Sequence, residues 1–519
     1  MMAGSFLNYY SNDGQRSHTV ATKTMNHVQI VSRHMVLPEP PPERDTTIDL
    51  TTWDLSMISL EYNQKGILLP KPPATGGQGH HAVVERLASS LARALGRFYP
   101  YAGRLAVTPG SNADRESIVI SLCCSMEGAE FVHAVAPGVT VADVVSTPLR
   151  LRTPGVVRPF FSLDGLHGVD AAVGSHPLLA AQVTELADGF FVAMSLSHVV
   201  ADGTAFWHLF NTWSEISRRG SDGAISSPLP VHRRWFLDGC PVPIPLPFPR
   251  QEDIPVNRRT DEHPSSVKEE CFLNFSAEMI KKLKAKANAE MSGTSISSLQ
   301  ALLAHLWIAV CRARRLAPDQ RTTYVLAVGC RGLVDGLPAA YAGNAVARVE
   351  AVSTAGEILE RGLGWAASLL NRAVASFDVA SERGRHSSWR QRPSFLRVPS
   401  RPTATAMVVT GGSPWFDAYG NDFGWGRPVG VRSGPANKMD RTATAFEGRS
   451  GGGSMALEVC LPPEVLARLV ADEEFMRHTA QVMSLGEVDL VVLGGEFSVC
   501  SSRPTRQRTC IVAALWISM

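Results

Sequence analysis

The chain has 519 residues, of which 45% are hydrophobic and 19% are charged, and its formal net charge at pH 7 is +2. This composition is typical of a globular protein, and the length favours two domains over a single core. The small net charge gives no reason to expect a nucleic acid or an anionic membrane as a partner. Membrane-spanning helices are excluded as well, because no apolar run reaches the roughly twenty residues that such a helix needs.

The cysteines and the N-terminal residues indicate the compartment. The nine cysteines are scattered and contain no Cys-x-x-Cys pair, which argues against a zinc site and against a disulfide framework. The first residues are polar and lack the apolar segment of a secretory signal. We therefore expect reduced thiols, a cytoplasmic protein, and a disordered extension over residues 1–24.

Hydrophobic spacing predicts the main elements in chain order. Alternating apolar residues predict a strand that begins near Val28, and a stripe at helical spacing predicts a helix over the residues Val84, Leu87, Leu91, Leu95 and Phe98. Prolines at every second position predict an extended crossing segment at 241–249. Two further helices are predicted at 276–289 and 295–314, with His305 packed inside the second one.

The most informative stretch lies between a predicted strand at 190–197 and a predicted helix at 204–218. It places His198 four residues before Asp202, with Gly203 allowing a sharp backbone turn. Such a turn suits a histidine that removes a proton and a carboxylate that holds the site in shape. The spacing alone is common, and a hydrogen-bonded structural histidine would give the same pattern.

Four further stretches distinguish these interpretations. The first is the glycine-rich stretch Asp422-Phe423-Gly424-Trp425-Gly426. The other three stretches are Leu50-Thr51-Thr52-Trp53-Asp54, the run from Leu95 to Leu105, and Tyr341-Ala342-Gly343-Asn344. Together with the histidine turn, and in this order from Met25 to His478, the chain resembles the BAHD superfamily of plant CoA-dependent acyltransferases.

The resemblance implies an α/β fold of two similar chloramphenicol-acetyltransferase-like domains. Each domain would be a mixed β-sheet flanked by helices, with the active-site channel between the two. We expect the first domain at 25–220, with the segment 420–450 packed on it, a crossover at 221–265, and the second domain at 266–480. The tail at 481–519 has no counterpart in the family.

The resemblance also implies the chemistry. Acyl-CoA would be the co-substrate, no cofactor or metal would be bound, and His198 would be the general base. A covalent acyl-enzyme is not expected, which is consistent with the absence of a convincing nucleophile motif. Asp202 could orient His198 directly, but the family pattern implies that it pairs with Arg331. Leu333 stands where the family often has a second arginine.

Several other residues receive roles from the same comparison. Structural support is expected from Gly203, Asp422, Gly424, Trp425 and Gly426. Thr410 or Ser413 is expected to donate a hydrogen bond to the oxyanion. Which of the two matches the donor found in some family members is not decided, because the sequence around them does not align uniquely with the family pattern. Lys284 could contact CoA phosphates, although a solvated helix face explains its lysine-rich surroundings equally simply.

We expect a monomer that acylates a hydroxyl, or less favourably an amine, of a plant specialised metabolite or a surface-polymer precursor. Two alternatives remain. Peptide-synthesis condensation domains share the motif, but they usually carry two adjacent histidines, whereas Ser197 precedes His198 here. A small-molecule-binding protein that kept the fold without catalysis is the other, supported by Leu333 and the unusual ends.

Overall fold

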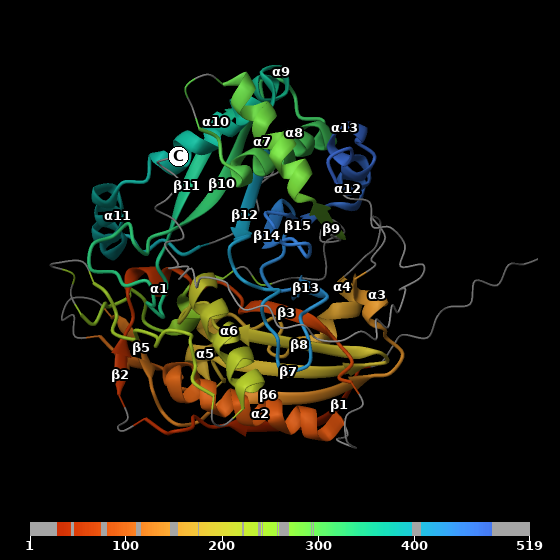
Figure 1. The fold of residues 1–519 in the computed structure, drawn as a ribbon. Coiled ribbons are helices and arrows are strands. Elements are labelled where there is room, and N and C mark those ends of the chain that lie inside the picture. The colour runs from red at the N-terminus through yellow and green to blue at the C-terminus, as the bar shows by residue number, and fades with distance from the viewer. Residues whose placement is uncertain are drawn as a thin grey trace, which may run out of the picture.

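The computed structural model describes residues 28–42, 46–73, 80–110, 116–145, 154–174, 176–220, 223–236, 240, 242–256, 258, 269–291, 293, 295–396 and 406–479. The predicted extension at 1–24 and the tail at 481–519 lie outside this range. Two six-stranded mixed sheets, each flanked by helices, form two bodies that lie one above the other in Figure 1. The predicted α/β class with two sheet-and-helix domains is confirmed.

The first sheet has the strand order β1-β6-β7-β8-β3-β13. Its strands are β1 (Gln29–Val36), β3 (Asn63–Pro70), β6 (Ala129–Ala136), β7 (Leu179–Leu186), β8 (Gly189–Leu196) and β13 (Gly430–Ser433). A smaller sheet contains β2 (Thr47–Asp49), β4 (Arg104–Pro109) and β5 (Ile118–Cys123). The accompanying helices are α1 (Thr52–Ser56), α2 (His80–Arg97), α3 (Val141–Val145), α4 (Pro154–Val157), α5 (Gly168–Val173) and α6 (Gly203–Arg219), with the 3₁₀ helices η1 (Tyr99–Ala102) and η2 (Arg158–Phe160).

Helices α2 and α6 bury their apolar faces against this sheet, because the predicted stripes lie at helical spacing. Every stripe residue of α2 is buried, and so are the inward residues of α6. Trp213 of α6 is fully buried, and its indole N–H donates to the carbonyl of Leu87 and the hydroxyl of Ser90 on α2, both at 3.0 Å. The helix pair therefore holds the strand-to-helix turn between β8 and α6 on a rigid support.

The second sheet has the order β11-β10-β12-β14-β15-β9. Its strands are β9 (Glu269–Phe275), β10 (Arg321–Gly329), β11 (Val346–Thr354), β12 (Met407–Gly412), β14 (Thr442–Glu447) and β15 (Met455–Leu461). The helices of this body are α7 (Ala277–Glu290), α8 (Ser298–Arg314), α9 (Ala355–Glu360), α10 (Gly362–Ala375), α11 (Val379–Gln391), α12 (Pro463–Val470) and α13 (Glu473–Met476). Helix α8 is buried almost throughout and forms the centre of the second core.

One predicted boundary was wrong. The helix predicted at 295–314 begins at Ser298, because Ser297 caps it: its hydroxyl accepts from the amide of Gln300, whose side chain accepts from the amide of Ser297. His305 is buried in this helix, as predicted, with Nε2 3.3 Å from the carbonyl oxygen of Phe475.

The crossing segment contacts both bodies and contains the 3₁₀ helix η3 (Gln251–Asp253). Leu246 exchanges backbone hydrogen bonds with Ile118 of the small sheet at 2.7 and 3.1 Å. Val231 donates to the carbonyl of Ala340 at 2.8 Å and accepts from the amide of Ala342 at 2.9 Å. The segment is therefore a hydrogen-bonded strap between the domains.

The segment predicted to pack on the first domain, 420–450, is divided between the two bodies. Its first part does pack there, since β13 pairs with β3 and appears in Figure 1 as a blue strand beside a red one. For its last part the prediction was wrong, because Thr442–Glu447 form β14 between β12 and β15 of the second sheet. In the described part of the chain, no helix is both long and apolar enough to cross a membrane.

Phe423 anchors this segment to the first domain. Its ring is fully buried and meets Trp213 edge-on, with 4.9 Å between ring centroids, and its carbonyl accepts from the hydroxyl of Ser217 at 3.0 Å.

Replacing Phe423 with alanine should lower the free energy of unfolding by about 3–5 kcal/mol, because it leaves a cavity beside Trp213. The measurement is urea denaturation, with Leu229→Ala as the matched control, since Leu229 is a large apolar residue that is 68% exposed. Equal effects of the two substitutions would show that the ring does not anchor the segment.

Candidate functional site

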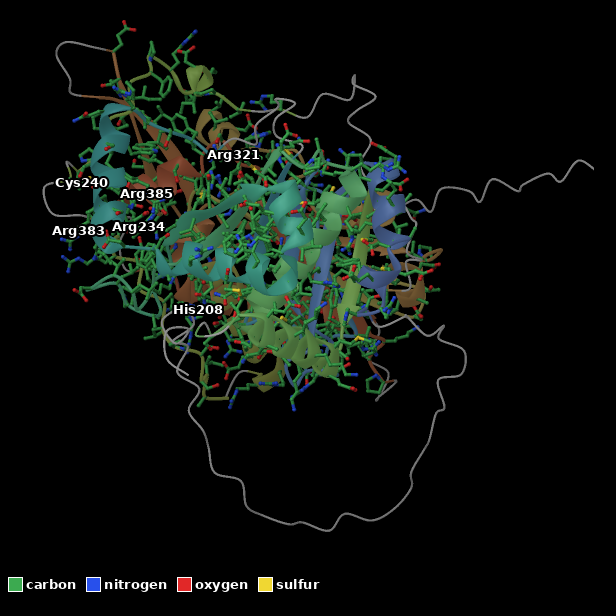
Figure 2. All side chains as sticks on the ribbon, turned by 90° about the horizontal axis from the view of Figure 1, so that it is seen from above. His208, Arg234, Cys240, Arg321, Arg383 and Arg385 are labelled. Carbon is green, nitrogen blue, oxygen red and sulfur yellow. The ribbon has the colours of Figure 1, made fainter. Side chains whose placement is uncertain are left out.

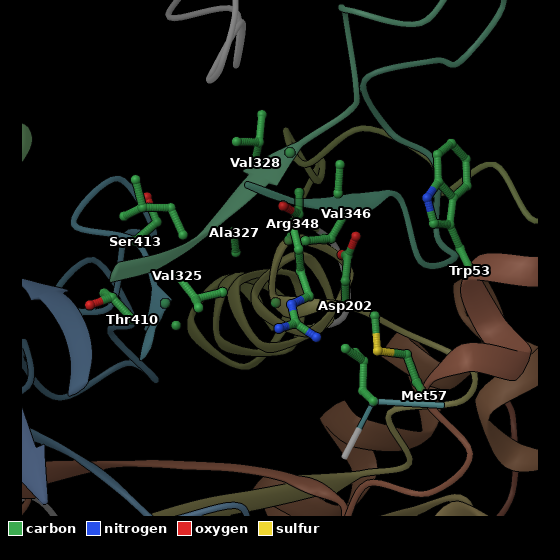
Figure 3. Close-up of a pocket in the computed structure, with 18 of the residues that line it drawn as sticks. Trp53, Met57, Asp202, Val325, Ala327, Val328, Val346, Arg348, Thr410 and Ser413 are labelled. Carbon is green, nitrogen blue, oxygen red and sulfur yellow. The ribbon is translucent and has the colours of Figure 1, made fainter. Parts of the chain in front are cut away.

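A cavity of about 1990 Å³ opens between the two bodies. Figure 3 shows side chains of both around it, with Met57 and Asp202 from the first domain and Val325 and Ala327 from the second. Strands β10 and β11 contribute a largely apolar wall. His198 lines the same cavity, so the predicted turn faces the space where the domains meet.

The turn that carries His198 is fixed on both sides. Strand β8 lies between β7 and β3 in the sheet, and the residues Val199, Val200 and Ala201 are buried. The imidazole is partly exposed to the cavity. Its Nδ1 is buried and makes no hydrogen bond of normal geometry with the described residues.

Burial lowers the pKa of His198 below its ordinary value of 6.5. Its own backbone, the negative charge of Asp202 and the amide of Asn344 act in the opposite direction, but they do not offset the burial. The imidazole is consequently neutral at pH 7 and can accept a proton.

Asp202 is fully buried. It accepts from Arg331 Nη1 and Nη2 at 2.7 and 3.1 Å and from the amide of Ala345 at 2.9 Å. It also caps α6 through the amide of Ala205 at 3.0 Å. The predicted pairing with Arg331 is present, whereas the alternative of a carboxylate bonded directly to His198 is not the arrangement found.

Arg331 follows the end of β10 and is held by more than Asp202. Its guanidinium also donates to the carbonyls of Tyr341 and Gly343 at 2.8 and 2.7 Å. Leu333 is partly buried and packs against the second core. The position where the family often has a second arginine therefore serves packing in this chain.

Gly203 is the first residue of α6, and its predicted role was wrong in detail. Its φ does not lie in the left-handed region, so the turn does not require glycine for backbone freedom. A Cβ at this position would lie 3.1 Å from the ring of Phe416, so the missing side chain leaves room for that ring.

The backbone carbonyls of the turn accept from two side chains outside it. Asn344 Nδ2 donates to the carbonyls of His198 and Val199 at 2.9 and 3.1 Å, and Arg234 Nη2 donates to that of Val200 at 3.0 Å. Asp54 Oδ1 accepts from Asn344 Nδ2 at 2.9 Å, and Asp54 Oδ2 lies 3.2 Å from Arg234 Nε. These contacts explain why the stretches around Asp54 and Asn344 accompany the histidine motif.

Arg234 is the residue that sequence reasoning missed. It lies in the crossing segment, on the side of the molecule that carries α11 and its Arg385, as the view in Figure 2 shows. No motif surrounds it, and only its near-complete burial (8% exposed) reveals a structural role.

Thr410 and Ser413 both line the cavity, from β12 and the turn after it (Figure 3). The Thr410 hydroxyl is 2.6 Å from the hydroxyl of Tyr324, and Ser413 Oγ accepts from the amide of Trp415 at 3.2 Å. The cavity thus has two hydroxyl groups on the wall formed by the second domain.

The glycine-rich loop lies outside the cavity lining. Asp422 Oδ1 accepts from the amides of Gly424 and Gly426 at 2.8 and 3.0 Å, and both glycines have a positive φ. The Trp425 indole donates to the carbonyl of Pro70 at 3.0 Å. These contacts fit the predicted structural role.

Lys284 lies on α7 and is not among the residues that line the cavity. Its neighbours Lys282 and Lys286 pair with Glu278 and Glu290 on the same helix. Contact of Lys284 with CoA phosphates stays a prediction. Among the residues that the structure describes, no cluster of three or more His, Cys, Asp or Glu side chains is arranged to bind a metal ion.

Arg331→Ala should lower the free energy of unfolding by about 3–5 kcal/mol, because it leaves the buried charge of Asp202 without its cation. In an Asp202→Asn background the same substitution should cost much less, and urea denaturation of the four proteins measures both values. Equal losses in the two backgrounds would mean that the charge pair does not stabilise the fold.

Comparisons with known proteins agree with this geometry. A model of the Transferase family matches residues 26–476. An uncharacterised acetyltransferase of Arabidopsis thaliana is 34% identical over 87% of this chain and 99% of its own length. The BAHD acyltransferase DCR of the same plant is 31% identical over 86% of this chain and 92% of its own.

Solved structures share the fold. Vinorine synthase matches with a TM-score of 0.64 and 19% identity, over 87% of this chain and 98% of its own. F. sporotrichioides TRI101, complexed with coenzyme A and T-2, has a TM-score of 0.64 and 19% identity, over 84% of this chain and 99% of its own. Since the family model spans both domains and the relatives match nearly end to end, the chain belongs to the BAHD superfamily and is an acyl-CoA-dependent acyltransferase.

Proposed function

We propose that this enzyme transfers an acyl group from a CoA thioester to a hydroxyl group of a small molecule, with His198 as the general base. The observation that carries the proposal is the position of His198, on a fixed turn at the wall of the interdomain cavity, where burial lowers the pKa of its imidazole. A neutral imidazole can accept a proton at neutral pH and return it within one turnover.

In the proposed reaction, His198 removes the hydroxyl proton as the acceptor oxygen attacks the thioester carbonyl carbon. The tetrahedral intermediate then collapses, the carbon–sulfur bond breaks, and the CoA thiolate takes the proton from the imidazolium. The products are an ester and free CoA, and the enzyme returns to its starting state. No acyl group is attached to the protein at any stage.

The surroundings of His198 favour this chemistry. Strand β10 gives the cavity an apolar wall, formed by Val325, Leu326, Ala327 and Val328. The negative oxygen of the intermediate needs a donor, and Thr410 or Ser413 would supply it. Either hydroxyl of the Tyr324–Thr410 pair can be the donor, and when Tyr324 donates, the Thr410 proton is left for the substrate.

A hydroxyl acceptor agrees with the names of relatives that transfer acyl groups to oxygen. Shikimate O-hydroxycinnamoyltransferase of Nicotiana tabacum is 29% identical over 66% of this chain, and omega-hydroxypalmitate O-feruloyl transferase of Arabidopsis thaliana is 26% identical over 77%. We accordingly propose a plant specialised metabolite or a surface-polymer precursor as the acceptor, and a cytoplasmic monomer as the working form. Free thiols at Cys123, Cys271, Cys311 and Cys330 support the proposal of a reducing compartment.

Acceptor-dependent thiol release from a panel of acyl-CoAs, mixed with pooled alcohols and amines, tests the proposal. His198→Ala should reduce the rate by about 10²–10⁴-fold, since it removes the base. His81→Ala is the matched control, because its side chain is 80% exposed on α2, and it should keep the wild-type rate.

Folded His198→Ala protein that releases thiol at the wild-type rate would contradict the role of the base. Folded wild-type protein that binds acyl-CoA but releases no thiol with any acceptor would favour a binding protein instead.

A further inference from the structure

A cluster of buried charges adjoins the cavity where the two sheets meet. It contains the cations Lys65 of β3, Arg432 of β13 and Lys438, and the carboxylates Glu270 of β9 and Glu458 of β15. Lys438 forms ion pairs with both carboxylates, at 3.1 Å to Glu458 and also to Glu270. Because three cations face two carboxylates, the cluster carries one uncompensated positive charge when all five groups are ionised.

The contacts of each cation locate the excess charge. Arg432 donates to the carbonyls of Val144 and Val145 at 2.9 and 3.1 Å, and its guanidinium lies 4.1 Å from the ring centroid of Phe272. Lys65 Nζ donates to the carbonyl of Gln64 at 3.2 Å, and none of the described carboxylates lies within ion-pair distance of it. Lys65 is therefore the cation of this cluster with fewest polar partners.

Lys65 also lines the cavity together with His198. Strand β3 pairs with β8 so that Asn63 is opposite Leu196, two residues before His198, and Lys65 is opposite Met194. The positive charge of Lys65 is close enough to contribute to the lowered pKa of His198. The two side chains thus line one cavity and are electrostatically coupled.

Burial lowers the pKa of Lys65 to about 8, and the charge of Glu458 only partly opposes this effect. At pH 7 the amine is still mainly protonated, so a cation that has no ion-pair partner among the described residues lines the cavity. Such a group is unfavourable until a ligand supplies the missing negative charge.

We propose that Lys65 binds a carboxylate group carried by one of the two substrates, next to the reacting carbonyl. This inference rests on the proposed function, because it assumes that both substrates meet at His198. A carboxylate matches the single excess charge. The CoA phosphates do not suit this position, since the whole pantetheine arm separates them from the thioester sulfur.

The carboxylate can come from either substrate. It would lie on the acyl group of a dicarboxylic acyl-CoA, or on an acceptor that is a hydroxy acid. A different role for Lys65, stabilisation of the oxyanion or of the CoA thiolate, would affect neutral and charged substrates equally. Comparison of matched charged and neutral ligands separates these roles.

The test is calorimetric binding to full-length His198→Ala protein, in which the proposed base is removed and binding is measured apart from turnover. The donor pair is malonyl-CoA and isovaleryl-CoA, which have similar shapes and differ in one carboxylate. The acceptor pairs are 3-phenyllactate, mandelate and 3-hydroxybutyrate with their methyl esters. Each ligand is measured with the His198→Ala protein that keeps Lys65, and with the same protein carrying Lys65→Met or Lys71→Met in addition. Lys71→Met is the control, since Lys71 is exposed.

The charged member of at least one pair should bind about tenfold more tightly or better, as expected for a hydrogen bond to a charged group. Lys65→Met should reduce this preference to less than about twofold, whereas Lys71→Met should leave it unchanged. A preference confined to the donor pair places the carboxylate on the acyl group, and one confined to an acceptor pair places it on the acceptor.

The proposal is overturned if no charged ligand is preferred, or if the preference survives in Lys65→Met. Lys65→Arg, which keeps the charge, should retain the tighter binding of the charged ligand. This variant therefore distinguishes loss of the charge from a change in the shape of the binding site. Because these measurements need no turnover, their failure is distinguishable from absence of acyl transfer in the thiol-release assay.

Discussion

The buried ion pair between Asp202 and Arg331 is the contact on which the site depends. Asp202 caps α6 in the first domain, and Arg331 follows β10 in the second, so the pair joins the bodies at the turn that carries His198. A buried carboxylate is tolerated only with such partners. The same junction provides Asn344, which bonds to the carbonyls of the turn. The position of the base is therefore set by how the two domains meet.

The charges around the cavity have opposite effects on His198. Asp202 favours the protonated imidazole, whereas burial and Lys65 favour the neutral one, and the net result is a lowered pKa. A base needs this balance, because it must be neutral before the reaction and charged during it. Asp202 is already neutralised by Arg331 and backbone amides, which limits its influence. The uncompensated cation Lys65 is then available to a substrate.

Much of the fold and part of the site could be predicted from the sequence. The apolar stripes of α2 and α6 and the turn at His198 follow from local spacing, and Arg331 follows from the family resemblance. The roles of Arg234 and Lys65 could not be predicted, because both depend on partners from distant parts of the chain. Lys65 follows Asn63 and Gln64 at the polar beginning of β3, a pattern equally typical of a solvated strand end. Division of the 420–450 segment between two sheets likewise depends on pairing between strands far apart in sequence.

The pH dependence of kcat/KM tests most directly whether the buried turn keeps His198 as a neutral base. With a substrate pair for which chemistry is rate-limiting, kcat/KM should rise with pH through one apparent pKa below 6.5, because burial favours the neutral imidazole of the free enzyme. Above that pKa the base is fully active. A rise centred above 6.5 would contradict the account.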